Sequence, residues 1–381
     1  MKNRSSKPRL ALFGYGILGG GTLGHGIPVL KDLFGRLSND FEIVYYCFVS
    51  IDATDVPSNI RVRQVTNLPL PGRLKFFLLS LICAIDHIRN PFSLLFAVSI
   101  YPTGQWAVRV GKVFRIPVAV QIIALEAVAL TDIGYGNLID PWLKKITQQV
   151  CEQTDVLIAV ADYQRKLAIS SLPTSRRIEV LPLRINCHNF PFIDRKITYP
   201  VRFIHVAYYS PIKDQDTMFR AFSAVSRKID CHLTVIGEGF DILKVKSLLE
   251  DLKIKDRVTF TGVLEQSQIP KYLANAHILL HTARFETGCA VIQEAMSSGV
   301  AVAGTRVGIL DDIGDRYAVT VPVADDEQLA AKILALINDD KLYERIRKES
   351  FQWISNYDAV WAYENYRKFL MGVVINDNQR D

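Results

Sequence analysis

The chain has 381 residues, of which 49% are hydrophobic and 22% charged, and its 45 Lys and Arg against 39 Asp and Glu give a formal net charge of +6. This length allows about two domains, and the composition excludes a disordered, collagenous or disulfide-dense chain. The charge is unevenly divided, because residues 1–190 contain 21 basic and 13 acidic side chains while residues 191–381 contain 24 and 26.

Short apolar runs rich in β-branched residues recur along the first half and predict strands. They alternate with longer segments of helical period, such as 141–154 and 163–171. Strands separated by helices imply βαβ units and a parallel sheet. The predicted strands of this sheet begin at Leu10, Glu42, Ser93, Val118 and Val156.

A stretch rich in proline and polar residues, 186–200, interrupts this alternation and predicts a linker. The alternation resumes after it, so a second parallel sheet is expected. Its strands are predicted in the runs 201–207, 231–237, 257–262, 276–282, 300–305 and 318–323, and its helices at 216–227, 242–251, 269–275 and 291–298.

These patterns predict an α/β protein of two Rossmann-like, doubly wound domains that face a central cleft. We expect an N-terminal domain over 1–190 and a C-terminal domain over 191–350. The remaining segment, 351–381, is helical and rich in aromatic residues, which predicts that it packs back across the domain junction. Ligands of such sheets bind beyond the carboxyl ends of the strands, so the cleft is the expected site.

The six cysteines form no CxxC pair and are interpreted as reduced thiols of a cytosolic protein. The N-terminus has positive charge followed by apolar residues, as in a signal peptide, but glycines interrupt the apolar part and no A-x-A site follows. We therefore predict a first strand and its loop there, with export as an alternative.

The most lipid-like stretch is Leu74–Ile85, which is shorter than the ~20 residues that a spanning helix needs. Arg61, Arg63, Arg73 and Lys75 lie just before or within it. Cations beside an apolar helix favour peripheral attachment to an anionic membrane. A buried helix with a solvated basic edge is the alternative, and both stay open. No basic stripe with interleaved aromatic residues or other nucleic-acid motif is present, which argues against nucleic acid as a partner.

The first predicted strand runs into a GxGxxG pattern at Gly14–Gly19, and further glycines follow through Gly20 and Gly21. A nicotinamide site also requires an acidic residue about 20 positions later, at the end of the second strand. Asp52 is the nearest residue in that structural position and lies well beyond that spacing. We therefore favour a glycine-rich loop that faces the cleft, with a nicotinamide-dependent enzyme as an alternative.

The second half contains residues suited to a nucleotide sugar. Lys213 follows a strand and opens a helical segment, where a cation can meet an anionic group. Glu286 and Glu294 flank the start of a helix whose first N–H groups, at Gly288, Cys289 and Ala290, suit a diphosphate. Glu286 can accept hydrogen bonds from sugar hydroxyls and Glu294 from a ribose diol. Each of these residues also has a plain surface or helix-terminus interpretation when taken alone.

Four motifs occur in order: Lys213, the GEG turn 237–239, the VTFTG run 258–262 and the segment FETGCAVIQEAMSSGVAVAGT at 285–305. Together they resemble the donor-binding domain of the family-four retaining glycosyltransferases, glycosyl transferases group 1, of GT-B fold. Their pattern has two glutamates separated by seven residues, followed by a GxPV-like strand. In this chain Ala301 stands where proline is usual.

The resemblance implies transfer of a sugar, with retention at the anomeric carbon, from a nucleotide-diphosphate donor such as a UDP- or GDP-sugar. It implies no bound metal and no permanently bound cofactor. Catalysis would involve Lys213, neutralising the leaving diphosphate, and Glu286, holding donor-sugar hydroxyls. The expected donor-binding residues are Gly19, Gly20, Gly21, Gly237, Gly262, Val263, Thr287, Gly288, Cys289, Ala290 and Glu294.

Two departures from the family pattern bear on the catalytic assignment. Tyr208 stands where many members carry an arginine, and the run Val118–Ala127 lacks the histidine that often lies near the reacting sugar. His25 and Arg306 are the substitutes to consider. Either other residues compensate, or activity is reduced.

The expected function is therefore glycosyl transfer to a glycan or lipid-linked acceptor, in cell-surface polysaccharide or glycolipid synthesis. A non-catalytic relative that binds a nucleotide sugar or a glycan is the main alternative. We expect a cytoplasmic protein, with peripheral contact at the inner face of the membrane if the acceptor is lipid-linked.

Overall fold

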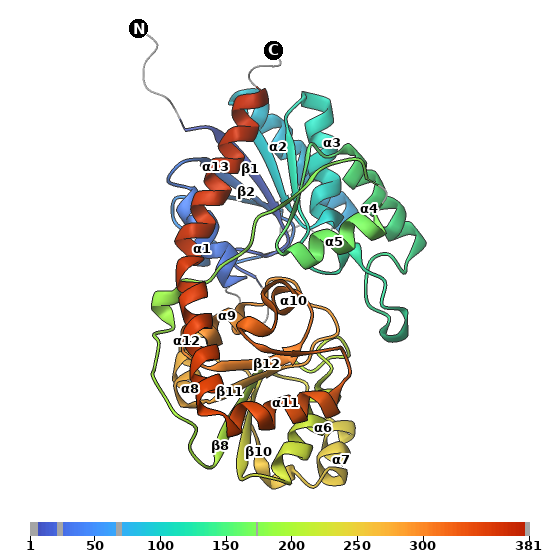
Figure 1. Cartoon of the computed structure of the whole chain (residues 1–381). Coiled ribbons are helices and arrows are strands. Elements are labelled where there is room, and N and C mark those ends of the chain that lie inside the picture. Colours follow the sequence, from blue (N-terminus) through green and yellow to red (C-terminus); the bar gives the residue numbers. More distant parts are fainter. Residues whose placement is uncertain (1–6, 21–25, 66–70, 173, 378–381) are drawn as a thin grey trace. The chain divides into compact units, whose positions relative to one another are not determined.

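The computed structural model describes residues 7–20, 26–65, 71–172 and 174–377. The chain divides into two compact units, each with its own parallel sheet (Figure 1). The first unit comprises Met1–Leu183 together with Ala359–Asp381, and the second comprises Arg184–Asp358.

The first unit contains a seven-stranded parallel sheet in the order β3-β2-β1-β4-β5-β6-β7. Leu10 in β1 pairs with Ile43 on one side and with Leu94 on the other, so the strand order reverses between β1 and β4. The strands are β1 (Arg9–Gly14), β2 (Glu42–Cys47), β3 (Arg61–Gln64), β4 (Leu94–Val98), β5 (Val118–Gln121), β6 (Val156–Ala159) and β7 (Ile178–Val180).

Helices cover both faces of this sheet. Ala11 and Phe13 of β1 pack with α2 to α5 on one face, and Leu10 and Leu12 pack with α1 and α13 on the other. This alternation follows from the two-residue period of a strand that is buried on both sides. The helices are α1 (Pro28–Leu37), α2 (Gly72–Arg89), α3 (Gln105–Phe114), α4 (Pro141–Gln153), α5 (Asp162–Ser171) and α13 (Ala359–Asp377), with a π-helical turn η2 at Ile100–Gly104.

The second unit contains a six-stranded parallel sheet in the order β10-β9-β8-β11-β12-β13, which reverses between β8 and β11. Phe203 in β8 faces a core shared with α6, α7, α11 and α12. Helices α8 and α9 contact the sheet at β8, β11 and β12. The strands are β8 (Val201–Val206), β9 (Cys231–Ile236), β10 (Val258–Phe260), β11 (Ile278–His281), β12 (Ala301–Thr305) and β13 (Val319–Val321).

The helices of the second unit follow its strands in βαβ order. They are α6 (Gln215–Ser226), α7 (Leu243–Asp251), α8 (Ile269–Asn275), α9 (Ala290–Ser297), α10 (Ile309–Ile313), α11 (Asp326–Asn338) and α12 (Asp340–Asn356). The prediction of an α/β protein with two parallel sheets is confirmed. Among the described residues, no helix is both long and apolar enough to span a bilayer.

The predicted linker 186–200 belongs to the second unit, where hydrogen bonds of two arginines hold it. Arg195 donates to the carbonyl oxygens of Leu273 and Ser298, both at 2.8 Å. Arg347, which is 1% exposed, donates to the carbonyl oxygens of Ile193 and Gly299. These bonds fix the linker residues on the second core.

The units divide at Leu183 rather than at residue 190, and the predicted terminal segment 351–381 divides between them at Asp358. Its first residues end α12 in the second unit, whereas α13 packs on the first. Tyr366 of α13 is fully buried and donates to the carbonyl oxygen of Leu181 at 2.7 Å. Packing of this segment across the domain junction stays a prediction.

Candidate functional site

The site of the second unit lies in loops at the carboxyl edge of its sheet, where β8 and β11 are neighbours. Lys213 lies in the loop between β8 and α6, and Glu286 in the loop between β11 and α9. The Thr282 hydroxyl donates to the carbonyl oxygen of Lys213 at 3.2 Å and to that of Asp214 at 2.9 Å. These bonds join the two loops, so residues 73 positions apart in sequence come into contact.

Lys213 and Glu286 form an ion pair between the Nζ and Oε2 atoms. Their side chains are only 17% and 16% exposed. Burial alone would raise the pKa of Glu286, but the attraction of the Lys213 ammonium and a hydrogen bond from His281 outweigh it and hold this pKa far below its usual range. Burial likewise opposes the charge of Lys213, but Glu286 raises the lysine pKa above its ordinary value. Each charge is therefore stable because the other is present.

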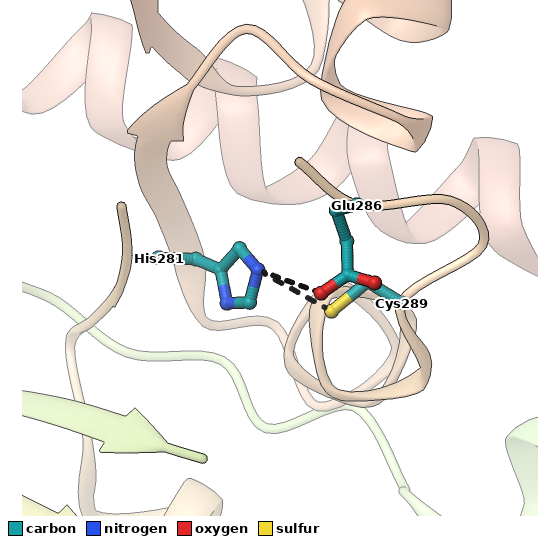
Figure 2. Close-up of side chains that lie close together, drawn as sticks. All are labelled: His281, Glu286 and Cys289. Atoms are coloured by element: carbon teal, nitrogen blue, oxygen red, sulfur yellow. Dashed lines mark hydrogen bonds and ion pairs between the residues drawn. The ribbon is translucent and has the colours of Figure 1, made fainter. Parts of the chain in front are cut away.

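His281 ends strand β11 and joins this pair, although the sequence did not indicate it. Its Nε2 lies 3.4 Å from Glu286 Oε2 and 3.6 Å from Cys289 Sγ (Figure 2). Burial lowers the pKa of His281, so its imidazole is neutral at pH 7. The one available signal was its place as a polar residue at the end of an apolar strand beside the predicted site.

The ligand atoms of His281, Glu286 and Cys289 lie within 4.8 Å of one another (Figure 2). Histidine nitrogen, carboxylate and thiol are also the donor types of zinc sites. In this structure the Lys213 ammonium already binds the carboxylate, and burial raises the pKa of the Cys289 thiol. The Glu286 carboxylate is therefore paired with the Lys213 ammonium, and the Cys289 thiol stays protonated, whereas a zinc ligand would be a thiolate.

The start of α9 is held in place by several bonds around the predicted diphosphate residues. The N–H of Thr287 donates to Glu286 Oε1 at 3.2 Å, and the side chain of Gln293 donates to the carbonyl oxygen of Gly288 at 2.6 Å. Cys289 precedes the helix with a φ of 21°, and Ala290 is its first residue. The first N–H groups of a helix lack partners within the helix and attract anions, so this turn suits a phosphate.

Glu294 lies in the second turn of α9 and is 6% exposed. Burial raises the pKa of its carboxyl to about 7. Its nearest recorded partner is the side-chain amide of Gln266 at 3.5 Å. This weak contact leaves a buried carboxyl with capacity for further hydrogen bonds, as the prediction of a ribose partner requires.

The loops after β9 and β10 meet at the same edge of the sheet. The N–H of Gly237 donates to the carbonyl oxygen of Gly262 at 3.0 Å. Gly237 has a φ of +142°, and a Cβ there would lie 2.0 Å from the carbonyl oxygen of Ala207. Val263 follows Gly262 and is 41% exposed. Glycine is thus required at 237 by close backbone packing.

Other predicted residues lie elsewhere. Gly19 and Gly20 belong to the first unit, and Gly21 lies outside the described residues, as does His25. A Cβ on Gly20 would lie 2.8 Å from the carbonyl oxygen of Gly16, so this loop is tightly turned. The part played by these glycines in donor binding stays a prediction.

Arg306 and Tyr208 bear on the departures from the family pattern. Arg306 donates to Asp315 at 3.1 Å and to Thr320 at 3.0 Å, so its guanidinium is already engaged. Tyr208 is 54% exposed. In the first unit, the carboxylate of Asp52 accepts a hydrogen bond from the N–H of Thr54 at 2.9 Å and caps a short turn.

Residues 190–353 match the family model described as glycosyl transferases group 1. The chain carries a glycosyl transferases group 1 domain. The match begins within the linker segment of the second unit and ends in α12, and so includes the ion pair of Lys213 and Glu286.

Curated relatives agree with this family. The chain is 28% identical over 168 residues to N-acetyl-alpha-D-glucosaminyl L-malate synthase of Bacillus anthracis, a match covering 42% of this chain and 43% of the relative. It is 22% identical to a GDP-mannose-dependent alpha-(1-6)-phosphatidylinositol monomannoside mannosyltransferase of Mycobacterium tuberculosis, covering 61% of this chain and 64% of the relative. The first of these matches thus spans less than half of the curated relative, and the second less than two thirds.

Solved structures share the fold of the whole chain. HepE of Anabaena, crystallised with UDP, superposes with a TM-score of 0.77 at 16% identity, and the match covers 96% of this chain and all of that one. A sucrose-phosphate synthase of Thermosynechococcus elongatus gives 0.74 at 15% identity, covering 96% of this chain and all of that chain. The predicted GT-B fold is confirmed.

Proposed function

We propose that the protein is a retaining glycosyltransferase that moves a sugar from a nucleotide-diphosphate donor to a glycan or lipid-linked acceptor. The observation that carries this proposal is the buried ion pair of Lys213 and Glu286 beside the start of α9, inside a glycosyl transferases group 1 domain. Relatives named as GDP-mannose-dependent transferases, and neighbours crystallised with UDP or UDP-glucose, support a UDP- or GDP-sugar as donor.

The roles of the residues follow from their charges. The ammonium of Lys213 would turn from Glu286 to the departing diphosphate, whose negative charge grows as the glycosidic bond breaks. The first N–H groups of α9, from Gly288 to Ala290, would bind the same phosphates. Glu286, released from the lysine, would accept hydrogen bonds from the donor sugar.

The remaining contacts concern the nucleoside. Glu294 would bind the ribose diol, and the backbone near Gly262 and Val263 would meet the base. The loop of Gly19, Gly20 and Gly21 would close on the phosphates and sugar from the first domain. This assignment uses protein cations and helix N–H groups for the diphosphate, so it requires neither a metal nor a permanently bound cofactor.

The names of the relatives also indicate a class of acceptor. The mycobacterial transferase has phosphatidylinositol in its name, as does a phosphatidylinositol N-acetylglucosaminyltransferase subunit of Arabidopsis thaliana. We propose synthesis of a glycolipid or cell-surface polysaccharide at the cytoplasmic face of a membrane, with peripheral contact through the basic first unit.

The test combines ligand binding and transfer. In a thermal-shift screen, UDP or GDP should raise the melting temperature of the full chain more than ADP does, since a ligand stabilises the state that it binds. Lys213→Ala and Glu286→Ala should each lower transfer, or donor hydrolysis, by ~10²-fold or more. Unchanged turnover in both variants would exclude the proposed site. Tight donor binding without transfer or hydrolysis would instead identify a non-catalytic relative, and saturable NADH binding a nicotinamide enzyme.

A further inference from the structure

Helix α2 of the first unit has an exposed apolar stripe along its full length. Its members are spaced three or four residues apart, which places them on one face of the helix. They are Leu74, Phe77, Leu81, Ile85 and Ile88, with exposed fractions of 41%, 50%, 47%, 40% and 70%. A continuous row of large apolar side chains in water marks a contact surface rather than a solvated face.

The exposed charges next to this stripe are positive. Arg89 lies at the end of α2, and the neighbouring helix α3 exposes Arg109 and Lys112. The one carboxylate of α2, Asp86, is buried and bonded to Tyr46 and Arg63. Helix α3 contains no acidic residue. This surface therefore complements a negatively charged partner.

A pocket of about 530 Å³ opens where the stripe begins. Arg73, Arg109 and Lys145 line it, and no carboxylate is among the described residues that do. The guanidinium of Arg73 lies 5.5 Å from the ring centre of Trp142, and that of Arg109 lies 4.5 Å from that of Trp106. Stacking on the rings orients the two guanidinium groups and leaves their N–H donors for a ligand.

The stripe and the pocket are parts of one surface, because the ring of Phe77 packs edge-on against Trp106 with centroids 6.3 Å apart. The pocket lies among the first turns of α2, α3 and α4 and the turn after β4. In a parallel sheet these elements begin at the carboxyl edge of the strands, where ligands of doubly wound folds bind.

We infer that this pocket binds the phosphate head group of an anionic phospholipid, while the stripe on α2 lies in the interface of the bilayer that contains it. Guanidinium and ammonium groups bind phosphate oxygens through charge-assisted hydrogen bonds. Indole rings and apolar side chains occupy the boundary between head groups and acyl chains. The inference rests on the proposed function and deepens it, because it names the lipid that would hold the first unit at the membrane that carries a lipid-linked acceptor.

The experiment measures binding of the full chain, without donor, to vesicles of phosphatidylcholine with and without phosphatidylglycerol. We expect binding to the phosphatidylglycerol vesicles only. The triple variant Arg73→Ala, Arg109→Ala and Lys145→Ala should bind them about 100-fold more weakly, from about fivefold for each cation removed. The matched control Lys166→Ala, Arg176→Ala and Arg177→Ala removes the same charge from exposed positions on the same unit and should lose much less.

Further variants separate the stripe from the cations. Phe77→Ser, Leu81→Ser and Ile88→Ser together should abolish vesicle binding while thermal unfolding of the first unit, followed by circular dichroism, stays close to that of the wild type, which shows that this unit of the variant is folded. Equal losses in the pocket and control variants would overturn the inference, as would a wild-type chain that binds neither vesicle. The inference would also be overturned if soluble glycerol phosphate bound the protein as tightly as the phosphatidylglycerol vesicles do, since the stripe would then contribute nothing. None of these outcomes depends on sugar transfer, which is tested separately.

Discussion

Lys213 and Glu286 are charged in a largely buried environment because each neutralises the other. Removing one partner of such a pair leaves an uncompensated charge and typically costs 3–5 kcal/mol. We therefore expect Lys213→Met and Glu286→Gln to lower the free energy of unfolding by about 3 kcal/mol each. The double variant should lie within about 1 kcal/mol of the wild type, because no unpaired charge remains. Urea denaturation of the four proteins measures this cycle.

The exposed pair of Lys255 and Glu250, with 66% and 59% of the side chains exposed, is the matched control. Its two single variants should each leave the free energy of unfolding nearly unchanged, because solvent screens an exposed ion pair. If the changes in the free energy of unfolding caused by Lys213→Met and Glu286→Gln add in the double variant, the two residues do not stabilise each other. The proposal that Lys213 leaves Glu286 to bind the diphosphate would then lose its basis.

Glu294 should make stability depend on pH near neutrality. Burial raises the pKa of its carboxyl from 4.5 to about 7 in the folded protein. The folded chain then binds a proton that the unfolded chain releases, so this stabilisation is complete below pH 4.5 and is lost as the pH rises to 7. Between pH 4.5 and pH 8, the free energy of unfolding of the wild type should therefore fall by up to about 3 kcal/mol relative to that of Glu294→Gln, which lacks this carboxyl.

Unfolding in urea at several pH values measures this difference. Glu250→Gln is a suitable comparison, because Lys255 lowers the pKa of that exposed carboxyl and the substitution should leave the profile unchanged from pH 5 to pH 8. Parallel wild-type and Glu294→Gln profiles over the same range would show that Glu294 is ionised in the folded protein.

At the scale of elements, α10 supports the loop that carries Glu286. Gly308 precedes α10 with a φ of +56°, and a Cβ there would lie 2.4 Å from the carbonyl oxygen of Thr287. Gly314, at the other end, has a similar φ of +62° and no atom within 4 Å of such a Cβ. Both alanine variants incur backbone strain of ~1 kcal/mol. Only Gly308→Ala should also displace the loop and weaken nucleotide binding, by tenfold or more.

Isothermal titration of the two alanine variants with the nucleotide that binds the wild type distinguishes these effects. Equal affinities in Gly308→Ala and Gly314→Ala would mean that the loop tolerates the displacement and that its position does not set nucleotide affinity.

The sequence predicted all six strands of the second sheet and the five central strands of the first, but it missed the two edge strands of the first sheet. Strands such as β1 and β11 are buried on both faces and therefore appear as continuous apolar runs. The edge strands β3, with the sequence RVRQ, and β7, with only three residues, lack such a run and were not predicted. The site was also predicted only in part. Lys213 and Glu286 could be predicted because they follow apolar strands, whereas the contact of His281 with Glu286 depends on side-chain packing that no spacing encodes.

At the scale of the whole molecule, the two units have separate cores and the group 1 domain match lies entirely in the second. We expect residues 184–358, expressed alone, to fold cooperatively and to bind the same nucleotide as the full chain. Residues 1–183 alone should not, because the sheet face that Tyr366 and Leu370 cover would be exposed. Circular dichroism during thermal unfolding tests both fragments, and adding a peptide of residues 359–377 to the first should restore its transition. A stable transition in 1–183 alone would contradict this view of α13.

The division of charge was informative at this scale, but it did not locate a surface. It indicated only that the first half should meet an anionic partner. The structure resolves this average into Arg73, Arg109 and Lys145 around one pocket, beside an apolar stripe formed by residues that the sequence pattern suggested could lie on a membrane. The pocket could not be predicted, because α3 and α4 reach it from separate parts of the chain.

The place of α13 in the first unit also affects the order of events on the ribosome. The residues of α13 that complete the first core, from Tyr363 to Val374, are translated after the whole of the second core. All residues of the second core leave the exit tunnel earlier, and domains generally fold as units during synthesis. The first unit therefore completes its core after the second unit, and the apolar sheet face that α13 covers stays exposed on the nascent chain until α13 has left the exit tunnel.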